Sequence, residues 1–419
     1  MPNLKKVHII LWVLVFFEGL IRLLELPVGI VRAGIPVLII YMLMITIQKK
    51  KLYFPFIKTQ IILTGVIIIS GFINQIELFQ ILDFLTYVIF PYLYFIVIIN
   101  EKDFELIKSI RKLIIELFVI QLIAAFIKLL IVGQAEDYIG TISLNAGSMS
   151  TIIPLIATSF LFPMYYKTEN KKYAFYIFLF AVFGIIGEKR AIVIMIPLLI
   201  FILLIIQNYI TKQSINKIIS SIFKISIIGA FLIYIMIRLN PTLTPENEIG
   251  GSFDIEYVNN YILDYEKSNE NEKKRGEISR SEGLVYFFNH VNKFEIENYL
   301  IGEGAGKLLI NEDNPMELFY KVRYGGRMGI IWLLLQIGIV GMGLCLSIYI
   351  RILYKTFKTA ILNRDKLINI DNFILIGLIL TFLWDTIIYS SSSIMYFIIP
   401  GLIFFQYAYT LNLKMIDSK

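Results

Sequence analysis

The 419-residue sequence has little cysteine, histidine or charge. Its single cysteine, Cys345, excludes an intramolecular disulfide. Its two histidines, His8 and His290, are too few for a histidine-built metal site. The sequence predicts no cofactor. Only 17% of the residues are charged, whereas soluble globular proteins contain about a quarter. The shortage of charge therefore argues against a soluble globular protein.

Apolar residues are abundant instead. Hydrophobic residues make up 57% of the chain and recur in runs of about 18 or more, the length a helix needs to cross a bilayer. The sequence thus predicts an all-α, polytopic integral membrane protein. The first run carries charges and lacks a small-residue cleavage site, so we interpret it as a retained span and not as a signal peptide. Twelve spans are expected, at 7–24, 28–47, 57–73, 78–99, 112–132, 148–166, 173–187, 190–207, 218–238, 328–350, 371–389 and 393–412.

Basic residues concentrate in alternate connections between these spans. With twelve spans, all such clusters fall on one side, and opposite short loops such as NQIEL and YSSSS contain no Lys or Arg. By the positive-inside rule both termini are cytoplasmic, which fits the cytoplasmic (inner) membrane of a bacterium. The formal net charge of +7 is then a topology signal. Membrane lipid is the expected partner of this charge, and nucleic acid is not.

Two features break the alternation, and both are predicted on the outer face. One is the corner GEKRA, residues 187–191, inside an otherwise apolar stretch. The other is a large extracytoplasmic loop at 239–327, which separates a transmembrane bundle at 1–238 from the last spans at 328–419. In this loop five apolar residues recur at helical spacing and predict an amphipathic helix on the membrane surface or over the bundle mouth: Leu284, Phe287, Phe288, Val291 and Phe294.

Cations gather at the same outer face. Arginine side chains match phosphate oxygens bidentately, so this group predicts a binding site for a lipid-linked phosphate or pyrophosphate. The alternative, that the corner charges are solvated or snorkel to the interface, stays open. The predicted outer cations are Arg32, Lys189, Arg190, Arg280, Arg323 and Arg327.

Three stretches, in this order, resemble motifs of the O-antigen polymerase and ligase family. YIGTISLNAGSMSTIIPLIA is similar to the family's glycine-and-asparagine entry to a span, with Gly140 and Asn145 in the matching places. GEKRAIVIMIPLLI looks like its arginine-containing corner. RSEGLVYFFNHVNKFEIENYLIGEGAG resembles an arginine-and-aromatic helix that ends in a Gly-x-Gly-x-Gly turn, and its first residue is Arg280. The layout of about twelve spans and one large outer loop extends the likeness over nearly the whole chain.

The resemblance implies a Wzy-type polysaccharide polymerase. Such an enzyme transfers a growing glycan from undecaprenyl pyrophosphate to a newly flipped, lipid-linked repeat unit, and makes O-antigen, capsule or a similar polymer. It is a metal-independent membrane glycosyltransferase of GT-C-like character whose partners are the undecaprenyl-pyrophosphate-linked oligosaccharide and, in some systems, a chain-length regulator. Arg190 and Arg280 match arginines that are functional in the family.

Two departures qualify the resemblance. The ligases carry a His-Asn element after the glycine turn, whereas NEDNPMELFYKVRYGGRMG contains no histidine, which favours a polymerase. The corner also has Glu188 and Lys189 where the family pattern has serine. A ligase therefore remains one alternative. A lipid-linked oligosaccharide flippase is another, although it would be expected to show two similar halves, and this chain has a single large outer loop.

The transfer requires cations for the departing pyrophosphate and a base for the attacking hydroxyl. We assign catalysis to Arg190 and Arg280, with Glu188 as the first choice of base because it adjoins Arg190. Histidine is a common catalytic base near neutral pH, but a structural or exposed role is favoured for His290 because it follows Asn289 on the flank of the apolar stripe. GEGAG is interpreted as a hinge, since a nucleotide loop would need a preceding strand. The predicted substrate-binding residues are Arg323, Arg327, Lys189, Asn145, Arg32 and His290.

Overall fold

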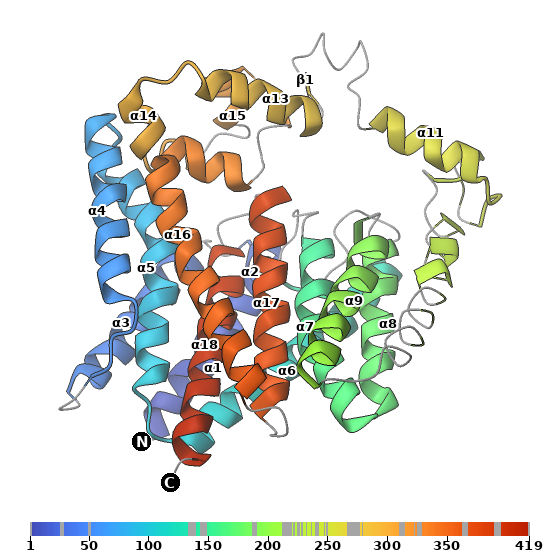
Figure 1. The fold of residues 1–419 in the computed structure, drawn as a ribbon, viewed down its shortest axis with the longest axis horizontal. Helices are drawn as coiled ribbons and strands as arrows, with labels where there is room; N and C mark the ends of the chain where they lie inside the picture. The colour runs from blue at the N-terminus through green and yellow to red at the C-terminus, as the bar shows by residue number, and fades with distance from the viewer. Residues whose placement is uncertain are drawn as a thin grey trace.

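The structure is a computed structural model that is almost entirely helical (Figure 1). It describes residues 2–25, 29–48, 52–132, 140–142, 149–186, 191–211, 243–246, 248, 250–265, 277–278, 280–309, 315–321, 323–324, 329–362, 368–388 and 395–417, with scattered residues between 220 and 238. The helices up to residue 211 are α1 (Pro2–Phe16), α2 (Glu18–Leu23), α3 (Gly29–Ile47), α4 (Ile57–Ile73), α5 (Leu78–Ile99), α6 (Phe104–Val132), α7 (Met149–Thr168), α8 (Lys171–Ile186) and α9 (Ala191–Thr211).

The later elements include short pieces and three long helices. In the described ranges the extended structure is one two-residue parallel pair, β1 (Glu277–Ile278) with β2 (Arg323–Tyr324). The helices are α11 (Ile255–Tyr265), α13 (Arg280–Val291), α14 (Ile296–Ile301), α15 (Pro315–Tyr320), α16 (Gly329–Leu362), α17 (Ile368–Ile388) and α18 (Met395–Asp417).

Several helices have the length and composition of membrane spans. Within the described ranges, α5, α16 and residues 104–131 of α6 are long and apolar enough to cross a bilayer. Shorter apolar helices accompany them at Ala33–Ile47, Ile57–Ile73, Ile194–Ile210, Ile370–Trp384 and Phe397–Leu413. The protein is therefore an all-helical protein of membrane type. Over their described residues the predicted spans other than 218–238 fall on helices, apart from a break at Phe17 in the first span, while the number of spans stays a prediction.

Helix α16 extends beyond the predicted span end at residue 350. Its last turns are amphipathic: Ile352 and Thr356 are buried against the bundle, while Arg351 and Lys355 are exposed. A prediction based on an uninterrupted apolar run places the helix end too early here, because the helix continues with one apolar face and one charged face.

The sequence suggested one continuous helix for the first span. In the structure this span breaks at Phe17, between α1 and α2. The segment 140–142 inserts at the break: Thr141 Oγ1 donates to the Phe16 carbonyl (2.8 Å), and the Gly19 N–H donates to the Ile142 carbonyl (3.1 Å). From α6, the side-chain oxygen of Gln121 accepts from the Thr141 N–H (2.8 Å). Irregular backbone inside an apolar bundle persists where protein groups satisfy it, and here they do.

The charges predicted inside spans have different environments. Glu18, at the start of α2, is 1% exposed. Glu116 instead lies on the surface of α6, where its carboxylate is 3.7 Å from Lys112 Nζ. Glu18 thus faces the protein interior, whereas Glu116 is exposed beside a charged partner, near the start of the predicted span 112–132.

The bundle packs around α5, α7, α17 and α18, with α5 along α18 and α7 between α8 and α17. Some of its buried polar groups pair with one another. The indole N–H of Trp12 donates to the Tyr94 hydroxyl (2.9 Å), and that hydroxyl lies 3.3 Å from His8 Nδ1. The chain termini lie together at one end of the bundle, whereas β1, α13, α14 and α15 cover the opposite end (Figure 1).

Candidate functional site

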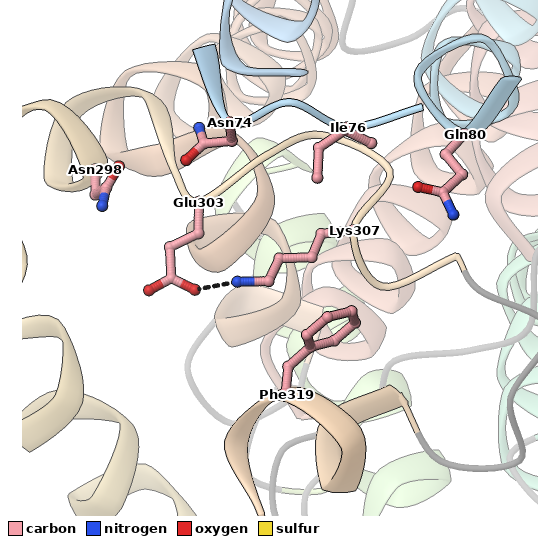
Figure 2. Close-up of a pocket in the computed structure, with 7 residues that line it drawn as sticks. All are labelled: Asn74, Ile76, Gln80, Asn298, Glu303, Lys307 and Phe319. Atoms are coloured by element: carbon pink, nitrogen blue, oxygen red, sulfur yellow. Dashed lines mark hydrogen bonds and ion pairs between the residues drawn. The ribbon is translucent and has the colours of Figure 1, made fainter. Parts of the chain in front are cut away.

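A cleft of about 380 Å³ opens at the end of the bundle opposite the termini. It is formed by the turn between α4 and α5, by α14 and the glycine turn that follows it, and by α15 (Figure 2). Its size falls within the range of small-molecule sites. Seven residues line it: Asn74, Ile76, Gln80, Asn298, Glu303, Lys307 and Phe319.

The glycine turn fits its place because it has no side chains at three positions. Gly302, Gly304 and Gly306 have φ of +84°, +123° and +99°, a region that L-residues rarely adopt. A Cβ on Gly302 would lie 2.5 Å from the backbone of Gln336, and one on Gly306 would lie 2.6 Å from the backbone of Gln80. The expected hinge is therefore a packed turn, wedged between α16 and the start of α5.

Hydrogen bonds fasten this turn to two helices. Ser70, near the end of α4, accepts from the Ala305 N–H (3.2 Å) and donates to the Gln336 carbonyl (2.8 Å). Asn74 donates to the Gly302 carbonyl (3.1 Å). Since Ser70 and Gln336 are fully buried, these bonds are shielded from water and fix the position of the turn.

Glu303 is the centre of a polar cluster at the cleft wall. Its carboxylate accepts hydrogen bonds from Lys307 Nζ (2.9 Å) and from the Tyr320 hydroxyl, and lies 3.3 Å from His290 Nε2. The Glu303 and Lys307 side chains are 15% and 22% exposed. The cluster joins three elements, because His290 belongs to α13, Tyr320 to α15, and Glu303 and Lys307 to the glycine turn.

These contacts decide the protonation of the cluster. Burial raises the pKa of the Glu303 carboxyl, but the hydrogen bonds from Tyr320 and Lys307, with the charges of Lys307 and His290, outweigh burial and lower that pKa below its usual value. Burial and the Glu303 charge raise the pKa of Tyr320. At neutral pH Glu303 is a carboxylate, and Tyr320 is a phenol that donates to it.

Helix α13 confirms the predicted amphipathic helix in part. Phe287 and Val291 are buried, and Phe287 packs edge-on against Tyr320. Phe288, expected on the same apolar face, is 62% exposed and does not pack against the protein as Phe287 does. Its position, one residue beyond Phe287, rotates it about 100° around the helix and away from the cluster.

The structure brings some of the predicted site residues together. Strand pairing sets Glu277 opposite Arg323, so the backbone of Arg323 lies beside the segment that leads into Arg280, the first residue of α13. His290 follows on the same helix and reaches Glu303. Arg32 lies in the first turn of α3, which is not part of the β1–β2 pairing. Five further predicted site residues lie outside the described residues: Asn145, Glu188, Lys189, Arg190 and Arg327.

Sequence reasoning missed Glu303, Lys307 and Tyr320. A signal existed for the first two, because acidic and basic residues four apart flank the glycines of GEGAGK and can pair. Tyr320 and the amides at positions 74 and 80 carried no such signal, since only the fold brings them to the turn. Among the described residues, no group of three or more His, Cys, Asp or Glu side chains forms a site for a metal ion.

Comparison with known proteins does not identify a family for this chain. No protein-family model matches the sequence, and no curated protein matches it either.

Proposed function

We propose that the chain is a polysaccharide polymerase that joins undecaprenyl-pyrophosphate-linked oligosaccharide repeat units at the outer face of the cytoplasmic membrane. The observation that carries the proposal is the polar Glu303 cluster, built on the glycine turn that resembles the polymerase and ligase motif and located at the end of an apolar bundle opposite both termini. The proposal includes twelve spans, cytoplasmic termini and one large outer loop at 239–327.

The reaction proposed is glycosyl transfer. A hydroxyl oxygen of the acceptor sugar attacks the anomeric carbon of the donor glycan, and the bond from that carbon to the pyrophosphate oxygen breaks. The lipid pyrophosphate leaves with the electron pair, and the hydroxyl proton passes to a base. Cations positioned at the leaving group lower the barrier because negative charge develops there in the transition state.

The residues divide between these tasks. Arg190 and Arg280 neutralise the departing pyrophosphate, with Arg32, Lys189, Arg323 and Arg327 as further phosphate ligands and Asn145 as a ligand for sugar hydroxyls. Glu188 is the base. The backbone pairing of β1 with β2 supports a joint role for Arg280 and Arg323, since it sets the backbone of Arg323 beside the segment that leads into α13, whose first residue is Arg280. His290, 3.3 Å from the Glu303 carboxylate, is a ligand at the same outer end.

The test is polymerisation by purified protein in lipid nanodiscs, with a lipid-pyrophosphate-linked repeat unit and EDTA, read as a product ladder on a gel. Wild type should form a ladder, and Arg190→Ala and Arg280→Ala should each lower the rate about 10²–10³-fold, as loss of one transition-state contact does. Lys293→Ala, an exposed cation of the same outer segment, is the matched control and should retain the wild-type rate.

Other outcomes would replace the proposal. A single transfer of glycan to an acceptor lipid, without a ladder, would identify a ligase. Movement of the lipid-linked unit across vesicle membranes, without any transfer, would identify a flippase.

A further inference from the structure

The cleft contains polar groups that have no hydrogen-bond partner in the part of the chain that the structure describes. The side-chain amides of Gln80 and Asn298 are half-buried at its wall, and neither makes a hydrogen bond to another described residue. Asn74 uses its amide nitrogen for the carbonyls of Ser70 and Gly302. Each open amide offers both donors and an acceptor, and a ligand that supplies both kinds of group would satisfy them.

The charge balance of the cleft selects among polar ligands. Its carboxylate and its ammonium group, Glu303 and Lys307, are paired with each other at 2.9 Å. A phosphate would need an uncommitted cation, and a metal ion would need uncommitted carboxylates. The lining therefore favours an uncharged ligand that is rich in hydroxyl groups.

An aromatic ring completes the wall. Phe319 is 37% exposed at the cleft, below the Glu303–Lys307 pair in Figure 2, and Lys307 Nζ lies 5.1 Å from its ring centroid. The ring is an apolar surface on the same cleft, and Figure 2 shows the amides of Asn298 and Gln80 at the two opposite sides of that cleft. Pyranose units match the amides and the ring, since a pyranose has hydroxyls around its edge and a face of C–H groups.

We infer that this cleft is a sugar-binding subsite, in which Gln80 and Asn298, at opposite sides of the cleft in Figure 2, hydrogen-bond hydroxyls of different sugar units and Phe319 packs against the C–H face of one sugar ring. That these sugar units belong to the lipid-linked glycan rests on the proposed function. The subsite then holds sugar units of the substrate, while the pyrophosphate is bound by the predicted arginines.

The experiment compares wild type with the Gln80→Ala/Asn298→Ala double variant and with Phe319→Leu, all full-length and in nanodiscs so that no glycoside detergent competes. The first readout is the KM for the lipid-linked repeat unit in the polymerisation assay. Two lost hydrogen bonds should raise KM about tenfold with kcat little changed. Asn289→Ala/Asn292→Ala removes two exposed amides of the outer segment and should leave KM unchanged.

If the KM of the double variant is within twofold of the wild-type KM, the subsite proposal is overturned, whereas the proposed polymerase function is unaffected. If wild type forms no polymer, the second readout is saturation-transfer NMR with methyl glycosides of glucose, galactose, mannose, rhamnose and N-acetylglucosamine. Transfer to at least one glycoside that the double variant loses supports the subsite, although the proposed function has failed. Absence of transfer with wild type overturns the subsite as well. Thermal unfolding of each variant, expected at the wild-type temperature, separates loss of binding from loss of fold.

Discussion

The backbone N–H of Gly306 donates a hydrogen bond of 3.0 Å to the side-chain oxygen of Gln336, which lies on α16. The same oxygen accepts from the Leu308 N–H (3.4 Å), and Gln336 is fully buried. One side chain of a bundle helix therefore satisfies two N–H groups of the glycine turn. The position of the cleft wall depends on α16 as directly as on the turn itself.

Gln336→Met should loosen this turn. The substitution keeps the length and apolar stem of the side chain but leaves the N–H groups of Gly306 and Leu308 buried without an acceptor, at a cost of about 1–3 kcal/mol each. We expect a lower thermal unfolding temperature and faster proteolysis within residues 302–309. Gln48→Met, at an exposed position, is the control. Unchanged proteolysis in Gln336→Met would show that packing alone holds the turn.

Gly302→Ala should destabilise the protein by more than its backbone angle explains. Gly250 has the same φ of +84° but nothing within 4 Å of an added Cβ, whereas at Gly302 the Cβ would meet the Gln336 backbone at 2.5 Å. Gly250→Ala should thus lose only about 1 kcal/mol, from the backbone conformation. Thermal unfolding followed by tryptophan fluorescence measures both. Equal losses would mean that the turn moves aside without cost.

The Arg111–Asp371 pair should matter for stability at the other end of the bundle. Its atoms are 2.6 Å apart, the side chains are 13% and 9% exposed, and the Arg111 guanidinium lies over the Tyr409 ring. Arg111→Met leaves Asp371 as a buried charge and should cost about 3–5 kcal/mol.

The neighbouring residue provides the control for that measurement. Lys112 pairs with Glu116 at 3.7 Å on the surface of the same helix, with side chains 81% and 57% exposed. Lys112→Met should leave the unfolding temperature unchanged, because exposed pairs contribute little. Adding Asp371→Leu to Arg111→Met should recover most of the lost stability, and a further loss would contradict the buried-charge explanation.

Glu303 should make stability depend on pH. Its contacts lower the carboxyl pKa in the folded state, so the stability that it contributes is fully present above the unfolded-state pKa of about 4.3 and is lost as pH falls through the lower folded value. Glu303→Gln should reduce the unfolding temperature at pH 7, and its difference from wild type should shrink as the pH is lowered below about 4.3. A difference that is constant down to pH 3 would exclude the carboxylate as its cause. Glu297→Gln, on exposed α14, serves as the control.

The sequence anticipated the helices well and the site only in part. Apolar runs identified the bundle helices because a helix whose side chains face lipid or the protein interior requires a long apolar run in the sequence. The break at Phe17 escaped notice, since the groups that fill it come from residues 140–142 and from Gln121 on α6. The predicted outer cations drew attention to the loop at 239–327. The importance of Glu303 was not predicted, because its contacts come from α13, α15 and the glycine turn, which only the fold brings together.

By itself, then, the sequence determined the class of the protein: low charge and long apolar runs leave an all-helical membrane protein as the way to bury that surface. It also marked Gly302, Gly304 and Gly306 as a special turn. Only the tertiary structure decided that the turn is packed between α16 and the start of α5, and that Gln336, Ser70 and Tyr320 hold it. The reason is physical. Hydropathy acts residue by residue along the chain, whereas a hydrogen bond between Ser70 and Ala305 exists only once helix α4 and the glycine turn that carry them have packed together.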